Sequence, residues 1–211
     1  MIVQGIDLQV GFSSVRLAAA GKVIHVDPAH INRPERADAI LITHEHDRHL
    51  SLPDIAKVFH EDAVVVINPV CHPPLLQLDR DIHTLVVVAA GERYEADGFS
   101  ILTTPAYTTS KTQGGRPCHP QLNDGLGFLI TLAGKTIYVA GDTDIIPEMA
   151  SFPPVDIALL PVSGGTVMTA EEAAQAAAAI KPTTAIPMHG SPEDQRAFEK
   201  LAACEVVLSA D

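Results

Sequence analysis

The sequence predicts a mixed α/β fold of four layers, an αββα sandwich in which helices cover the outer faces of two packed, mixed sheets. Short apolar segments typical of buried strands outnumber helical ones, and the chain divides into two halves of similar plan. Residues 85–140 lack the strand–helix alternation that a doubly wound parallel sheet, the competing architecture, requires. A length of 211 residues fits a single domain, 1–211, with a sizeable core.

In the first half, apolar and alternating segments predict strands at residues 2–10, 15–19, 23–26, 39–43 and 63–67. A short helix is expected over residues 51–59, with Ser51 as its cap and Asp54 at the third helical position. One helical turn is expected at 75–78, after the prolines that break the preceding segment.

In the second half, strands are expected at 85–89, 92–95, 99–103, 127–132, 136–140, 155–160, 184–187 and 205–208. Thr169 and Glu172 form a capping box that opens an alanine-rich helix ending near Ile180, and Ser191 caps the last helix. Residues 104–124 have no periodicity, and a loop of this length in a compact domain is usually functional or mobile.

Composition and charge limit the classes of partner. The formal net charge is −12 and the 14 lysines and arginines are dispersed, which disfavours nucleic acid and anionic membranes and leaves a small-molecule substrate. Three distant cysteines without a Cys-x-x-Cys pair favour a reducing cytoplasm. Neither a signal-peptide pattern at the N-terminus nor an apolar run of membrane-spanning length is present in the sequence. The oligomeric state stays open, a homo-oligomer included.

The strongest functional signal is the loop Thr43-His44-Glu45-His46-Asp47-Arg48-His49, which directly follows the buried strand at 39–43. Such a loop is where a rigid sheet presents catalytic groups. His44 and His46 can face one point, and His49 can join them if a helix starts at the turn. Scattered surface histidines are the plain alternative, but this concentration after a buried strand favours a metal site. Zinc is the default ion, and manganese or iron would accept the same ligands.

Polar groups follow apolar strands at four places: Asp27, the loop His44–His49, Asp142 and His189. The ends of strands in packed sheets can converge on one edge. Pooled there, these imidazoles and carboxylates are sufficient for one or two divalent ions.

These segments resemble the metallo-β-lactamase superfamily, and most closely its small cytosolic hydrolases related to ascorbate-6-phosphate lactonase. The matching segments are Gly11-Phe12-Ser13-Ser14-Val15-Arg16, Val26-Asp27-Pro28, Thr43-His44-Glu45-His46-Asp47-Arg48-His49-Leu50, Gly141-Asp142-Thr143 and Ile186-Pro187-Met188-His189-Gly190. The resemblance implies the αββα sandwich. It also implies a hydrolase that cleaves a small ester, lactone or phosphoester with a metal-bound hydroxide on one or two zinc ions.

The resemblance also implies a role for each matching residue. His44 and His46 would bind the first metal, His49 and His189 the second, and Asp142 would bridge the two. Asp27 would lie behind the ligands and orient the histidine loop by hydrogen bonds.

Three departures from the family pattern leave alternatives open. Arg48 occupies the position of an aspartate that ligates the second metal, so either Asp47 reaches the site through a shifted loop or the second site lacks its carboxylate. Tyr107 stands near the place of a further histidine, where it ligates, forms a hydrogen bond or leaves the role to His119. Phe12 sits where relatives often carry histidine. Asp47 and Tyr107 are therefore candidate catalytic residues, and Asp47 and His119 are further candidate ligands.

Charge alone suggests that Arg48, Lys111 or Arg116 receives an anionic group of the substrate. A second hypothesis is a binding or sensing protein on the same fold, with one metal or none. A third is a nuclease related to tRNA 3′-processing enzymes, which the acidic balance opposes. A serine hydrolase is disfavoured because the sequence has no Gly-x-Ser-x-Gly motif.

Overall fold

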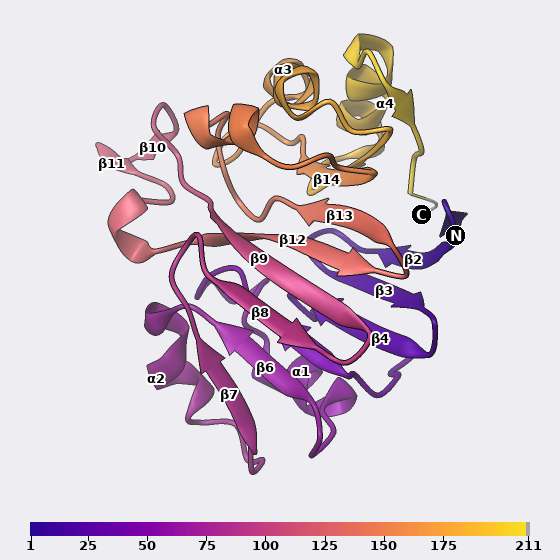
Figure 1. The fold of residues 1–211 in the computed structure, drawn as a ribbon. Coiled ribbons are helices and arrows are strands. Elements are labelled where there is room, and N and C mark those ends of the chain that lie inside the picture. The colour runs from indigo at the N-terminus through magenta and orange to yellow at the C-terminus, as the bar shows by residue number, and fades with distance from the viewer. Residues whose placement is uncertain (210–211) are drawn as a thin grey trace.

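The computed structural model describes residues 1–209 and contains two seven-stranded sheets with helices outside both (Figure 1). The helices α1 (Leu52–Val58) and α2 (His72–Leu75) lie against the first sheet. The helices α3 (Ala170–Ile180) and α4 (Pro192–Leu201) lie against the second sheet. The layer order is helix, sheet, sheet, helix, which confirms the predicted architecture.

The first sheet follows the chain from one edge to the other. Its strands are β1 (Ile2–Val3), β2 (Ile6–Val10), β3 (Val15–Ala19), β4 (Lys22–Val26), β5 (Ala39–Leu41), β6 (Val64–Ile67) and β7 (Thr84–Val87). The strands β1 to β4 pair antiparallel, and β4 to β7 pair parallel. The single strand expected at 2–10 is wrong, because Gln4 and Gly5 adopt φ angles of 50° and 86° and form a turn between β1 and β2.

The second sheet repeats this plan. Its strands, in spatial order, are β16 (Glu205–Val206), β15 (Thr184–Met188), β14 (Ile157–Pro161), β13 (Lys135–Val139), β12 (Leu126–Leu132), β9 (Phe99–Pro105) and β8 (Arg93–Ala96). The pairs from β8 to β13 are antiparallel, and those from β13 to β16 are parallel. Each half of the chain therefore contributes one sheet with an antiparallel part and a parallel part.

The loop expected over 104–124 contains short elements of its own. The end of β9 is followed by a small hairpin of β10 (Thr112–Gln113) and β11 (Arg116–Pro117), which projects from one side of the molecule (Figure 1). The 3-10 helix η2 (Gln121–Asn123) comes next. Two further 3-10 helices are η1 (Pro69–Cys71) and η3 (Pro147–Ser151).

The core between the sheets is mainly aliphatic. Leu17, Ile24 and Leu41 of the first sheet and Ile130 and Leu159 of the second belong to one buried cluster and have no exposed surface. Burial of each such side chain stabilises the fold by about 1.5–3 kcal/mol. This continuous packing fixes the two sheets relative to each other, and with them the loops at their edges.

Two of the three predicted helix caps form as expected. Thr169 with Glu172, and Ser191 with Asp194, make reciprocal capping boxes. Ser51 precedes α1 but donates its hydroxyl to Asp54 instead of capping the helix. The helical turn expected at 75–78 lies at 72–75 as α2, since proline suits the first turn of a helix.

The topology brings four strand ends to one edge of the sandwich. Asp27 follows β4 and His44 follows β5, and these two strands are parallel neighbours. Asp142 follows β13 and His189 follows β15, which run parallel on either side of β14. Among residues 1–209 no helix has the length and apolar character needed to cross a membrane.

Candidate metal centre

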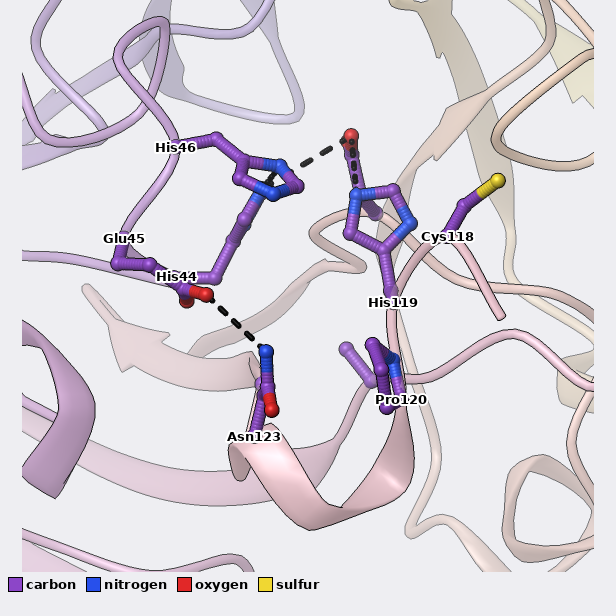
Figure 2. A pocket seen from close by; sticks show the side chains of 10 residues that line it. His44, Glu45, His46, Cys118, His119, Pro120 and Asn123 are labelled. Carbon is purple, nitrogen blue, oxygen red and sulfur yellow. Dashed lines mark hydrogen bonds and ion pairs between the residues drawn. The ribbon is translucent and has the colours of Figure 1, made fainter. Parts of the chain in front are cut away.

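Five histidines and one aspartate converge at this edge. His44, His46 and His49 come from the loop after β5, His119 from the segment between β11 and η2, and His189 from the end of β15. Figure 2 shows His44 and His46 approaching the site from one segment and His119 from another.

Asp142 lies at the centre of the cluster. Its Oδ2 atom is 3.3 Å from His119 Nε2, 3.5 Å from His189 Nε2 and 4.0 Å from His44 Nε2, and its Oδ1 atom is 3.6 Å from His49 Nε2. His46 joins through Nδ1, which lies 3.0 Å from His44 Nε2. Four imidazole nitrogens thus surround one buried carboxylate, and a fifth lies beside them.

Two overlapping groups have ligand atoms that all lie within 4.8 Å of one another. One group is His44, His46 and His119, and the other is His44, His49 and Asp142. His189 faces the same carboxylate. Imidazole and carboxylate are ligands that zinc, iron and manganese accept, so the donor set fits a divalent metal centre.

The second nitrogen of four of these rings is held by a neighbour outside the cluster. His44 Nδ1 lies 2.9 Å from Thr43 Oγ1, His49 Nδ1 2.7 Å from Asp27 Oδ2, His119 Nδ1 3.1 Å from the Thr166 carbonyl and His189 Nδ1 3.3 Å from Ser163 Oγ. Such outer partners fix the tautomer and the ring orientation of metal-binding histidines. Each of these four rings therefore presents Nε2 to the centre.

His119 Nε2 provides a separate test of fit. The atom is buried, and no group among the described residues offers it a hydrogen bond of good geometry. A buried polar atom without a partner is costly unless it binds something the protein itself lacks. A metal ion ligated by His119 would satisfy it.

Asp27 holds the histidine loop from behind. Its carboxylate accepts hydrogen bonds from the Thr43 N–H at 2.7 Å and the Thr43 hydroxyl at 2.6 Å, and it contacts His49. Asp27 and His189 both adopt the left-handed backbone region, with φ angles of 47° and 49°. Each residue in this region costs about 1–3 kcal/mol, and the hydrogen bonds between Asp27 and Thr43 help to offset that cost.

Gly141 sets the position of Asp142. Its φ angle is 65°, and a Cβ atom placed on it would lie 2.6 Å from the carbonyl oxygen of Leu126. A side chain is therefore excluded at this position on two grounds, the backbone conformation and the close approach of β12.

The electrostatics suit cation binding. Burial would raise the pKa of Asp142, but the contact with His119 and the nearby His49 and His44 hold it well below the usual range. Burial lowers the pKa values of His44, His46 and His189. An ionised Asp142 beside neutral His44, His46 and His189 is the state in which these groups bind a metal.

The structure does not bring Tyr107 to the cluster. Its hydroxyl donates to Glu148 Oε2 at 3.2 Å, and its ring packs in the apolar layer between the second sheet and α3. The main chain of Tyr107 is bonded to Thr143 and Asp144, which directs the side chain away. Of these two candidates, Tyr107 and His119, only His119 lies in the cluster.

Asp47 lies outside both ligand groups. It is exposed and lines a cavity of about 510 Å³ whose walls also include His46, His119, Asp142 and His189. Arg48 is exposed on the same wall. The shifted loop that would bring the Asp47 carboxylate among the ligands is therefore not observed.

Two of the three cations expected to bind substrate are elsewhere. Lys111 Nζ is 2.6 Å and 2.7 Å from the two carboxylate oxygens of Glu172 and 3.9 Å from Asp144 Oδ1, so its charge is neutralised. Arg116 is exposed on the β10–β11 hairpin and is not part of the cavity wall. This pairing makes Lys111 a poor candidate for binding an incoming anion.

Sequence reasoning missed the groups that hold the rings. Thr43 contacts Asp27, His44 and His49, and its place immediately before the histidine motif was the available signal. Asn123 of η2 donates to Glu45 Oε1 at 3.1 Å, beside His44 and His46 (Figure 2). The Thr166 carbonyl left no signal in the sequence, because any residue can supply a backbone oxygen.

The chain matches the beta-lactamase superfamily domain over residues 9–189. It is 33% identical over 174 residues to a UPF0173 metal-dependent hydrolase of Pyrococcus abyssi, covering 77% of this chain and 72% of the relative. It is 30% identical over 219 residues to a metal-dependent hydrolase of Thermococcus kodakarensis, covering 91% of each. A solved structure from Parabacteroides distasonis superposes with a TM-score of 0.83 at 28% identity, covering 97% of this chain and 92% of the other.

Proposed function

The chain belongs to the beta-lactamase superfamily, and from this premise we propose that it hydrolyses a small ester, lactone or phosphoester with water activated at a zinc centre. Its relatives are metal-dependent hydrolases, and metal-dependent hydrolysis is the activity of this chain at the level the family defines. The nearer resemblance to ascorbate-6-phosphate lactonase remains a prediction about the substrate.

The observation that carries the proposal is the convergence of imidazole nitrogens on Asp142. In this proposal His44, His46 and His119 would hold a first ion, His49 and His189 would hold a second, and Asp142 would contribute to both. A bound divalent ion lowers the pKa of a coordinated water toward neutrality and polarises the group to be cleaved.

The protein's own residues would do the remaining work. The cavity of about 510 Å³ opens onto the cluster and is large enough for a small substrate. Asp47 lies on its wall with its carboxylate exposed, and in the proposal it accepts the proton of the attacking water. Attack forms a bond from the water oxygen to the carbonyl or phosphoryl centre. The ester bond then breaks, and the leaving alkoxide takes up the proton that Asp47 accepted from the water.

A single-metal or metal-free binding protein is the second candidate, and Arg48 favours it. The family pattern has a carboxylate ligand at this position, and Asp47 does not replace it in the ligand groups. Metal stoichiometry separates the two candidates. Close to two ions per chain supports hydrolysis, and none after metal loading supports binding alone.

The test is metal analysis and hydrolysis by wild type beside His44→Ala and Asp142→Ala. We expect wild type to hold metal and to cleave 4-nitrophenyl acetate or bis(4-nitrophenyl) phosphate. We expect His44→Ala to empty the first site and Asp142→Ala to weaken both. His83→Ala is the matched control, because His83 is exposed and belongs to none of the groups of possible metal ligands among the described residues. Unchanged metal content in both cluster variants would overturn the ligand assignment.

A further inference from the structure

Arg48 is the cation that the fold leaves available beside the candidate centre. Lys111 is neutralised by Glu172, and Arg116 lies on the hairpin outside the cavity wall. Arg48 is exposed and lines the cavity. Among residues 1–209, no carboxylate oxygen lies within 4.0 Å of its guanidinium nitrogens. Its charge is therefore not neutralised by an ion pair, unlike that of Lys111.

Phe12 contacts the side chain of Arg48, and Ser13 contacts its backbone. Its guanidinium carbon lies 5.2 Å from the centroid of the Phe12 ring, and its backbone carbonyl accepts a hydrogen bond from Ser13 Oγ at 2.6 Å. A cation over an aromatic face in this range is attracted by the ring and partly screened from water by it. Stacking of this kind leaves the edge of the guanidinium, with its N–H groups, free to donate.

Phe12 connects Arg48 to the centre. Its ring centroid is 4.2 Å from that of His189, and its carbonyl accepts a hydrogen bond from the His189 N–H at 2.8 Å. The order Arg48, Phe12, His189 therefore runs from the rim of the cavity to the imidazole that faces Asp142. An anion bound by Arg48 would lie beside the cluster without displacing any of its ligands.

We propose that Arg48, supported by Phe12, binds an oxyanion of the substrate, a carboxylate or phosphate group separate from the bond that is cleaved. The planar fork of arginine matches both groups through two parallel hydrogen bonds. The inference rests on the proposed hydrolase function and narrows its substrate class to anionic esters, lactones or phosphoesters. Arg48 thus determines specificity at a position where the family pattern supplies a carboxylate.

The test compares ligands that differ only in a remote anion, by calorimetry on metal-loaded protein. Butyrate carries one carboxylate, succinate two, and 3-phosphonopropionate a carboxylate and a phosphonate. We expect wild type to prefer the two dianions by about 10-fold or more, the usual size of a hydrogen-bonded charge contact. Whichever dianion binds tighter identifies the preferred oxyanion.

The substitution Arg48→Gln should abolish this preference, Arg48→Lys should retain part of it, and the control Arg116→Gln should retain all of it. Metal content should be the same in all four proteins. A wild type without preference, an Arg48→Gln variant that keeps it, or loss of metal in Arg48→Gln would overturn the inference.

Steady-state hydrolysis kinetics provide an independent test. The ratio of kcat/KM for mono-4-nitrophenyl succinate to that for 4-nitrophenyl butyrate should fall about 10-fold or more in Arg48→Gln, mainly through KM. Loss of both substrates in parallel would contradict a role in specificity. If wild type shows the calorimetric preference but hydrolyses neither ester, the proposed hydrolase function fails while the anion site stands.

Discussion

Asp27 Oδ2 lies 2.7 Å from His49 Nδ1, and the pair joins the end of one strand to the histidine loop that follows the next. Both side chains are almost fully buried. Burial opposes a charge on His49, yet the adjacent Asp27 carboxylate raises the pKa of that imidazole. Asp27 therefore keeps a proton on His49 Nδ1 and turns Nε2 toward Asp142.

Asp27→Asn should lower metal affinity by about 10–100-fold while leaving the fold intact. The amide keeps one oxygen to accept from Thr43, but it presents an N–H₂ where the carboxylate now faces the Thr43 hydroxyl and His49. Competition with a chromogenic chelator measures the affinity. Asp38→Asn is the control, because Asp38 also accepts a backbone N–H, that of Val23, without touching the cluster. Equal losses in the two variants would contradict a specific role for Asp27.

His119→Ala should lose bound metal, whereas Tyr107→Phe should keep it. Loss of His119 removes one of three ligands from the first group and should abolish tight metal binding and activity. Tyr107→Phe removes only a hydroxyl that donates to Glu148, so metal content should be unchanged and the free energy of unfolding should fall by about 1.5 kcal/mol at most. Metal analysis and urea unfolding measure both effects. Loss of metal in Tyr107→Phe would mean that the Tyr107 hydroxyl contributes to metal binding.

The strand-end pattern explains why much of the centre could be predicted from sequence. Asp27, Asp142 and His189 each follow an apolar strand, and parallel strands place their carboxyl ends at the same edge. The sequence does not discriminate between Tyr107 and His119 as the residue at the centre, because residues 104–124 have no periodicity that would orient a side chain. Two hydrogen bonds with Thr108 hold His119 in place: the Thr108 N–H donates to the His119 carbonyl, and the His119 N–H donates to the Thr108 hydroxyl. Such contacts between loop residues produce no recognisable sequence pattern.

The sequence does not show which lysines and arginines are paired with acidic residues, for a related reason. Lys111 and Glu172 are 61 residues apart, and only the packed structure shows that they neutralise each other. Arg48 and Lys111 look equivalent in the sequence, yet one is stacked on Phe12 and the other is in an ion pair. The fold was predictable because burial follows local periodicity, whereas the state of a surface charge depends on distant partners.

Gly141→Ala should destabilise the protein more than Gly134→Ala. Both glycines have positive φ angles, 65° and 74°, so each variant bears a left-handed alanine at a cost of about 1–2 kcal/mol. Only at Gly141 would the new Cβ also lie 2.6 Å from a backbone oxygen, that of Leu126, whereas nothing lies within 4 Å at Gly134. Urea unfolding of the metal-free proteins measures the difference. Metal content should fall in Gly141→Ala alone, because Asp142 must move with the backbone.

Asp54 should make stability depend on pH on the acid side. Burial opposes its charge, but the contacts with Lys57 and Ser51 and the backbone N–H groups of His30 and Ile31 lower its pKa to about 2. A carboxyl whose folded pKa is depressed stabilises the protein above its unfolded pKa, near 3.8, and the effect is lost as pH falls toward 2. Asp54→Asn should therefore unfold at lower urea than wild type at pH 7 and at pH 5, and the gap should narrow below pH 4.

The matched control for Asp54→Asn is Asp62→Asn. Asp62 is exposed, and the shortest charged contact it makes among the described residues is 3.5 Å to His60, so its loss should leave the acid-side profile unchanged. Asp54 ties the loop at residues 30–31 to α1, the helix that begins just after the histidine motif. A gap between wild type and Asp54→Asn that stayed constant from pH 7 to pH 3 would mean that the variant loses packing, and that ionisation of this carboxylate contributes nothing to holding the loop.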